Sequence, residues 1–224
     1  QAAETFEVLR FAFLKAGSNV FYANNVASRA LTTSPPLRGD LRKITRAFKR
    51  NKAQMISLII KATGAVATEP VAPAFFAMGH TDLLPDLAGL AGWTPVEKYS
   101  DSTKALPYEV GKIEEIRFIL TPLCEPWAAA ATSITSSTYL VNGAAGVSGN
   151  PDVYPIIIVA RDAYAITPLQ GKNAAKIAVK NPEVSATDPL GQRGFASWKS
   201  YQAGLILNQL WIARYEVVAT GNPS

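Results

Sequence analysis

The sequence predicts a mixed α+β protein whose helices and strands are separated by irregular loops. Residues 2–16 and 37–61 carry apolar side chains at spacings of three and four, which is typical of amphipathic helices. Residues 153–160 form a continuous apolar run, which is typical of a strand covered on both faces. After Leu207, apolar and polar residues alternate as they do in a strand. Because helical and strand patterns do not alternate regularly, a parallel sheet of βαβ units is not expected.

The composition suits a large core and extensive contacts. Of the 224 residues, 48% are hydrophobic and 17% are charged, whereas soluble domains usually have about 25% charged residues. So few charges suggest that much of the surface is covered, either by subunit contacts or within one large core. The net charge of +5 fits proximity to nucleic acid. The longest uncharged stretch, 126–151, is rich in small residues, so we expect no membrane-spanning segment and no membrane partner.

Few residues are available for catalysis or metal binding. Cys124 is the one cysteine and His80 the one histidine, which excludes a disulfide framework and a Cys- or His-rich metal cluster. His80 and Asp82 could act as a base and its orienting carboxylate, but a histidine satisfied at a strand-to-helix turn is the favoured interpretation. Glu114 and Glu115 would point to opposite faces of a strand and would not converge on a substrate. We therefore predict no enzyme, no cofactor and no metal.

The first helix should end at Gly17, and residues 20–22 are short and β-prone. Gln1 is not an initiator methionine and no signal peptide precedes it, so we expect the chain to begin inside a longer product. After Ser34-Pro35-Pro36 the second helix is predicted, with basic residues opposite its apolar stripe. This candidate basic face consists of Arg38, Arg42, Arg46 and Lys49. It is interpreted as a solvated helix face or as a basic surface that meets nucleic-acid phosphates or an acidic neighbour.

The middle of the chain alternates between short strands and loops. We expect a buried strand at 74–78, a short helix at 82–90 and irregular structure over 93–105. Residues 116–120 alternate as a half-buried strand, and Ile113 is out of phase with them, which indicates a bulge near Glu114. The stretch 128–150 is dominated by small residues and is predicted to be a flexible loop or hairpin tip.

The segment Asp188-Pro189-Leu190-Gly191 is a turn signal, because Asp accepts local N–H bonds, Pro presets φ and Gly permits a positive φ. Arg193 follows it and suits a bidentate bond to a carboxylate, either in its own chain or across a subunit boundary. Trp198 is a candidate core or interface residue. We predict that Asp188, Arg193 and Trp198 shape a structural joint.

Several segments, taken in chain order, share a pattern with one known family. They are 16–22, the basic helix 41–55, Gly79-His-Thr-Asp82 with Asp86-Leu87, Glu109-Val-Gly111 leading into 116–118, Asp152-Val-Tyr-Pro155, Asp162-Ala-Tyr164, Asp188-Pro-Leu-Gly-Gln-Arg-Gly194 and Trp198-Lys199. The chain resembles the major capsid proteins of tailed bacteriophages, in the podovirus branch of the HK97-like fold. Tyr108 departs from that pattern, since glycine often stands at this position.

The resemblance implies an HK97-like α+β fold with a spine helix, a peripheral domain and an axial domain, whose N-terminal part is absent from this chain. Residues 1–36 would be the end of the spine helix and the following peripheral segment, 37–185 mainly the axial domain, and 186–224 the returning peripheral strands. The implied function is self-assembly into the icosahedral shell of a virion, built in the host cytoplasm, that encloses double-stranded DNA held nearby without sequence specificity. The implied partners are further copies in hexamers and pentamers, with portal, scaffold and decoration proteins as additional candidates. The alternative is a basic nucleic-acid-binding module that uses helix 38–52.

Overall fold

The computed structural model describes residues 2–61, 67–99, 105–106, 108–168, 175–183 and 190–221. Within them the chain is mixed α+β, as the sequence predicts. The α-helices are α1 (Ala2–Lys15), α2 (Arg38–Arg50) and α3 (Leu84–Ala88). The body contains an eight-stranded sheet made of β1 (Val20–Tyr22), β2 (Ile56–Lys61), β3 (Ala67–Gly79), β4 (Trp93–Pro95), β5 (Glu109–Ile113), β6 (Ile116–Leu120), β7 (Val153–Val159) and β12 (Ile212–Val218).

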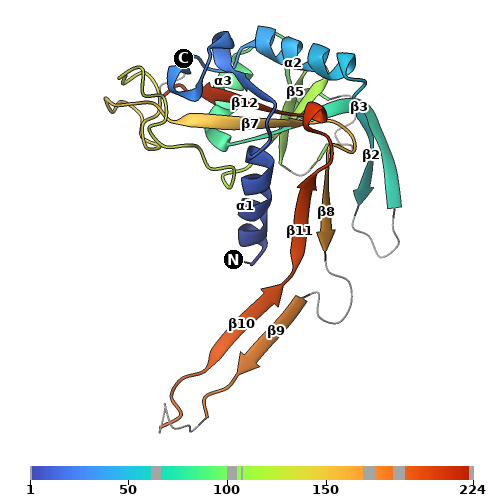
Figure 1. The fold of residues 1–224 in the computed structure, drawn as a ribbon, viewed down its shortest axis with the longest axis vertical. Coiled ribbons are helices and arrows are strands. Elements are labelled where there is room, and N and C mark those ends of the chain that lie inside the picture. The colour runs from blue at the N-terminus through green and yellow to red at the C-terminus, as the bar shows by residue number, and fades with distance from the viewer. Residues whose placement is uncertain are drawn as a thin grey trace.

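The sheet is mixed and brings distant parts of the chain together (Figure 1). Its order is β1-β12-β7-β3-β6-β5-β4, with β2 paired to β3 outside this path. The pairs β1–β12 and β3–β6 are parallel, and the other pairs are antiparallel. Strand β12, near the end of the chain, therefore lies between β1 and the central strand β7.

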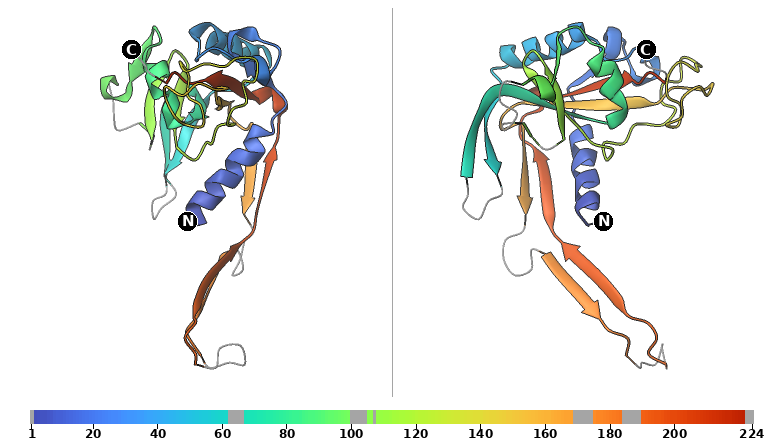
Figure 2. Two further views of the ribbon diagram at one scale, coloured as in Figure 1. Left: turned by 90° about the vertical axis from the view of Figure 1, so that its left-hand side faces the viewer. Right: turned by 180° about the vertical axis from the view of Figure 1, so that it is seen from behind.

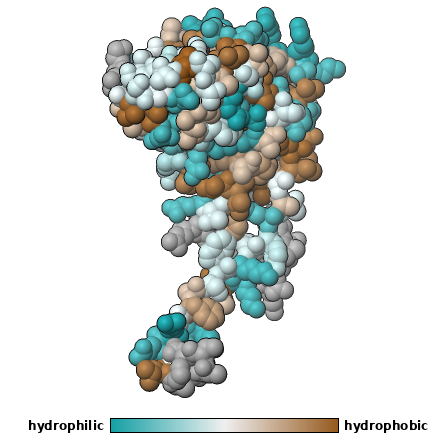
Figure 3. Space-filling model, turned by 60° about the vertical axis from the view of Figure 1, so that its left-hand side comes forward, coloured by the Kyte–Doolittle hydropathy of each residue, from teal (hydrophilic) through white to brown (hydrophobic). Residues whose placement is uncertain are grey.

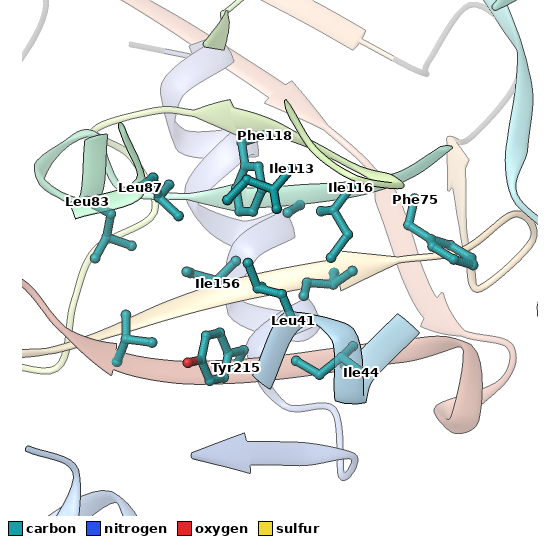
Figure 4. Packing of buried hydrophobic residues seen from close by; sticks show 14 of the residues in the cluster. Leu41, Ile44, Phe75, Leu83, Leu87, Ile113, Ile116, Phe118, Ile156 and Tyr215 are labelled. Carbon is teal, nitrogen blue, oxygen red and sulfur yellow. The ribbon is translucent and has the colours of Figure 1, made fainter. Parts of the chain in front are cut away.

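Both faces of the sheet are covered, so the body has three layers. Alternate residues of β7 point to opposite faces: Ile156 and Ile158 pack in a cluster with α2 and α3, whereas Ile157 and Val159 pack with α1. Figure 4 shows the first cluster, in which side chains of α2 lie against those of the sheet. Every residue of β7 is buried, which confirms the prediction of a strand covered on both faces.

The second predicted helix is shorter than expected. Helix α2 ends at Arg50, and residues 56–61 form strand β2, so the prediction of a helix through Lys61 is wrong beyond Arg50. Lys52 has φ +56°, which no α-helix can contain. The run of Ile and Leu that follows favours a strand. Met55 and Ile59 are four residues apart, a spacing that also fits a helix, and this led to the prediction of a longer helix.

The expected bulge near Glu114 is a tight turn instead. Glu114 and Glu115 connect the antiparallel strands β5 and β6, and Glu114 has φ +52°. The register shift in this pair lies between Glu109 and Gly111. Tyr108, just before β5, has φ +63°. The left-handed region that favours glycine is thus occupied here by an exposed tyrosine.

A long arm projects from the body (Figures 1 and 2). It consists of two consecutive two-stranded antiparallel ribbons, β8 (Tyr164–Pro168) with β11 (Gln202–Ile206), and β9 (Ala175–Lys180) with β10 (Phe195–Ser200). Helix α1 lies beside the first ribbon. Gly204 makes this approach possible, because a Cβ there would lie 2.4 Å from Cε1 of Phe13 on α1.

Gly204→Ala should lower the free energy of unfolding by about 1–3 kcal/mol, since the Phe13 ring must leave its place between α1 and β11. Urea denaturation followed by circular dichroism measures this change. The matched control is Gly39→Ala in α2, where no atom lies within 4 Å of the new Cβ. That change should raise stability by about 0.5–1 kcal/mol. Equal effects of the two substitutions would contradict the close packing of α1 on the arm.

Candidate functional site: an amphipathic arm and charged clusters

The β9–β10 ribbon of the arm has one apolar and one basic face. Residues directly opposite each other in an antiparallel pair share a face. The apolar face consists of Ile177 opposite Trp198 and Val179 opposite Ala196. Ile177 and Val179 are 77% and 70% exposed. Figure 3 shows hydrophobic side chains on the arm and where the arm leaves the body. Exposed apolar side chains that are grouped on one face, unlike single scattered ones, make this strip a candidate contact surface.

The basic face of the same ribbon places like charges together. Lys176 lies directly opposite Lys199 in the ladder, and Lys180 lies opposite Phe195. Like charges at directly opposed positions destabilise a sheet. Glu183 is 3.8 Å from Lys180, and both side chains are more than half exposed, so this pair is well solvated. An acidic partner would relieve the repulsion between Lys176 and Lys199.

Two of the three predicted joint residues, Arg193 and Trp198, lie on this arm. Asp188 falls outside the described residues. Arg193 and Trp198 are both exposed, and Trp198 is on β10, well inside the ribbon rather than at a corner. The Trp198 ring meets the ring of Phe6 on α1 edge-on, with 5.3 Å between the ring centroids. An aromatic contact therefore links the arm to the start of α1. The two residues are far apart in the sequence, so no local pattern predicts this contact.

The candidate basic face of α2 is met by acidic residues of the same chain. Arg38 and Arg42 both donate to Oε1 of Glu114, at 2.7 Å each, and Lys49 donates to Glu115. The hydrogen bonds from Arg42 and then Arg38 lower the pKa of Glu114. The link therefore contributes above the carboxyl group's ordinary pKa and is lost as the pH falls through the lowered value.

Arg46 lies on the same helix and is exposed. Within the described part of the chain it has no ion-pair partner. Three of the four candidate basic residues are thus partly neutralised by the turn between β5 and β6. A nucleic acid would have to compete with these carboxylates for Arg38, Arg42 and Lys49.

His80 is arranged as a structural residue. Its Nδ1 accepts a hydrogen bond from the backbone N–H of Asp82 at 3.2 Å and caps the short turn Thr81–Leu83. Asp82 in turn accepts from the hydroxyl of Tyr154, whose ring lies 5.5 Å from that of His80. Among the described residues no group of three or more His, Cys, Asp or Glu side chains could hold a metal. The described helices include none that is both long and apolar enough to cross a membrane.

Sequence reasoning missed two buried ion-pair networks. Glu216 is fully buried and accepts from Nε and Nη2 of Arg29 at 2.7 and 2.9 Å. Glu109 is also fully buried and binds Arg117 through two hydrogen bonds. The alternation of charged and apolar residues in a strand predicts which of them share a face, but not whether the charged face is buried. Glu109 and Arg117 are only eight residues apart, on paired strands, whereas Arg29 and Glu216 are 187 residues apart, so no local pattern points to the second pair.

No known protein-family profile matches this chain. It is 24% identical over 192 residues to a protein called major capsid protein in Pseudomonas phage KPP21. The aligned region covers 80% of this chain and 48% of that protein, so the chain spans about half the length of this relative. The chain is therefore similar, at a distance, to a phage major capsid protein.

Proposed function

We propose that this chain is a structural capsid subunit of a tailed phage that assembles with copies of itself into a shell. One observation carries the proposal: the arm projects from the body and exposes an apolar strip on one face and lysines on the other. An isolated ribbon of two strands is marginally stable in water, so it requires a partner surface. The distant similarity to a phage major capsid protein supports the same conclusion.

The proposed architecture is HK97-like. In it, α1 is the end of a spine helix, the arm belongs to the peripheral domain, and the three-layered body is the axial domain. The arm draws on residues 164–168 and 175–180 as well as on 195–206, and β12 lies in the body. In this proposal the peripheral part also includes strands that precede residue 186, and the chain returns to the axial part after the arm.

In the proposed shell each arm lies on a neighbouring copy in a hexamer or pentamer, and the assembled shell encloses double-stranded DNA in the virion. Contacts of permanent assemblies often bury about 2,000–5,000 Å² of surface. The low charge content of this chain favours such large contacts. Portal, scaffold and decoration proteins are further partners of such a shell. The proposal does not require an active site.

The test is electron microscopy and sedimentation of the purified protein over a range of concentrations and salt. We expect rings or closed shells, and we expect the assembled fraction to rise sharply with protein concentration. A chain that stays monomeric under all these conditions, also when joined to any further residues its gene encodes, would refute the proposal. The alternative module based on helix 38–52 predicts strongly salt-dependent DNA binding by the monomer. The pairing of Arg38, Arg42 and Lys49 within the chain weighs against it.

Arg193→Ala should reduce the yield of assembled particles more than the yield of soluble monomer. Arg193 lies on the arm, where a guanidinium suits a bidentate bond to a carboxylate of a neighbour. Particle counts by electron microscopy, normalised to monomer by size-exclusion chromatography, measure the effect. Arg193→Lys keeps the positive charge but loses the planar guanidinium that can bind a carboxylate through two N–H groups. We therefore expect a particle yield between those of the wild type and Arg193→Ala. Unchanged particle counts in Arg193→Ala would remove Arg193 from the interface.

A further inference from the structure

A positively charged cleft lies between α1 and the loop after β6. Its volume is about 470 Å³, and its walls include Lys15, Arg29, Arg214, Glu125 and Trp127. The three cationic side chains come from α1, from the turn Arg29–Leu31 and from β12, so the fold gathers them from three distant parts of the chain. None of them belongs to the arm or to the basic face of α2.

The cationic groups converge on one aromatic ring. The guanidinium carbon of Arg29 lies 3.5 Å from the centroid of the Trp127 ring, which is a stacked contact. The guanidinium carbon of Arg214 and Nζ of Lys15 lie at 5.6 and 5.7 Å from the same centroid. A ring face attracts cations, with the interaction strengthened where water is excluded. Trp127 therefore holds positive charge at the cleft wall.

The donors of these cations are only partly used within the described residues. Nε and Nη2 of Arg29 donate hydrogen bonds to the buried carboxylate of Glu216. Nη1 of Arg214 donates to the backbone carbonyl of Lys15, and Nζ of Lys15 donates to the backbone carbonyl of Glu125. Nε of Arg214 lies 2.8 Å from Oε1 of Glu216, yet it is buried and not aligned to donate a hydrogen bond. The geometry thus leaves guanidinium and ammonium N–H groups beside the cleft.

The charge balance favours a monoanion. Lys15, Arg29 and Arg214 contribute three positive charges, while Glu216 and Glu125 contribute two negative ones, which leaves one positive charge. One carboxylate would neutralise it. A phosphate dianion would leave excess negative charge next to Glu125, which is unfavourable in a partly desolvated site.

We propose that this cleft binds a single carboxylate, with its oxygens on Arg29, Arg214 and Lys15 and its alkyl part against Trp127 and α1. The natural source is an acidic side chain of a second copy of this chain, a step that rests on the proposed function. The carboxylate would fix a contact between copies at a place separate from the arm.

The binding test uses the soluble monomer and is independent of assembly. The probe is the α-amide of N-acetyl-L-glutamic acid, compared at constant ionic strength with the corresponding glutamine derivative and with inorganic phosphate. The readout is the indole N–H resonance of Trp127 in two-dimensional NMR, assigned with Trp127→Phe. We expect a saturable shift with a Kd on the order of 1 mM for the glutamate probe, as for a small ligand held by a few polar contacts. No comparable shift is expected with the other two.

The matched variants are Lys15→Gln and Lys112→Gln. Lys15 lies 5.7 Å from the Trp127 ring and Lys112 lies 5.1 Å from the Tyr99 ring, near the opposite edge of the sheet. Lys15→Gln should raise the Kd of the glutamate probe about fivefold, which is the effect expected when one exposed ion pair is lost. Lys15→Arg should retain binding, and Lys112→Gln should change nothing. A shift that does not saturate, an equal shift with the glutamine derivative, or tighter binding of phosphate would overturn the carboxylate site.

The source of the carboxylate is tested separately by assembly. Lys15→Glu should lower the particle yield, whereas Lys112→Glu should not. If the glutamate probe binds but both variants assemble as the wild type does, the carboxylate does not come from a second copy. If the wild type never assembles, the proposed function fails while the binding result stands.

Discussion

Replacing Arg117 with alanine should lower the free energy of unfolding by about 3–5 kcal/mol, because the carboxylate of Glu109 is left buried without its cation. The Glu109 side chain is 0% exposed and that of Arg117 is 6% exposed. Glu109 also accepts from the Tyr99 hydroxyl at 2.8 Å and from the backbone N–H of Leu106 at 2.9 Å. Burial and the hydrogen bond to Glu109 raise the pKa of Tyr99. The network thus ties the segment before β5 to strands β5 and β6 of the sheet.

Urea denaturation of the soluble chain measures this effect. The double variant Glu109→Gln/Arg117→Met removes both charges and keeps an acceptor for Tyr99 or Leu106, so it should recover much of the loss. Arg42→Ala removes a guanidinium from a largely exposed pair and should have little effect. A double variant as unstable as Arg117→Ala would show that packing of the long side chain, and not the buried charge, determines the cost.

Ile177→Lys combined with Val179→Lys should abolish particle formation and leave the stability of the monomer nearly unchanged. Both side chains are largely exposed in the subunit, so their replacement costs the isolated chain little. In a shell the new ammonium groups would be buried in an apolar contact, where unpaired charges cost several kcal/mol per copy. Repeated over every contact of a shell, this cost is far larger than the effect of Arg193→Ala.

Electron microscopy gives the particle count, and thermal unfolding of the monomer gives the stability. The matched control is Val147→Lys, which places a lysine on an exposed valine in the loop between β6 and β7, away from the arm. It should assemble more readily than the arm variant. Normal shells formed by the double arm variant would contradict the role of the apolar strip, and a destabilised monomer would place these side chains in contacts of its own chain.

Local patterns located most regular elements. The spacing of apolar residues gave α1 and α2, and the continuous run 153–160 gave β7, because helical and strand periodicities are properties of neighbouring residues. The same patterns failed at 56–61, where the isoleucines fitted either period, and at Glu114, where a turn was interpreted as a bulge. The resemblance to capsid proteins was likewise available from the order of short motifs, and the distant relative agrees with it.

The sequence by itself determined the α+β class, the positions of the main helices and the central strand, and the exclusion of a disulfide framework and of a Cys- or His-rich metal cluster. Only the tertiary structure decided that β12 inserts beside β7, that Glu216 and Glu109 are buried with arginines, and that Lys15, Arg29 and Arg214 meet at Trp127. It also decided that the paired strands of 164–168 with 202–206 and of 175–180 with 195–200 leave the body as an arm with an exposed apolar strip. The physical reason is that periodicity reports which face of an element is apolar, whereas the partner of that face, or of a charge, is set by contacts between residues far apart in the chain.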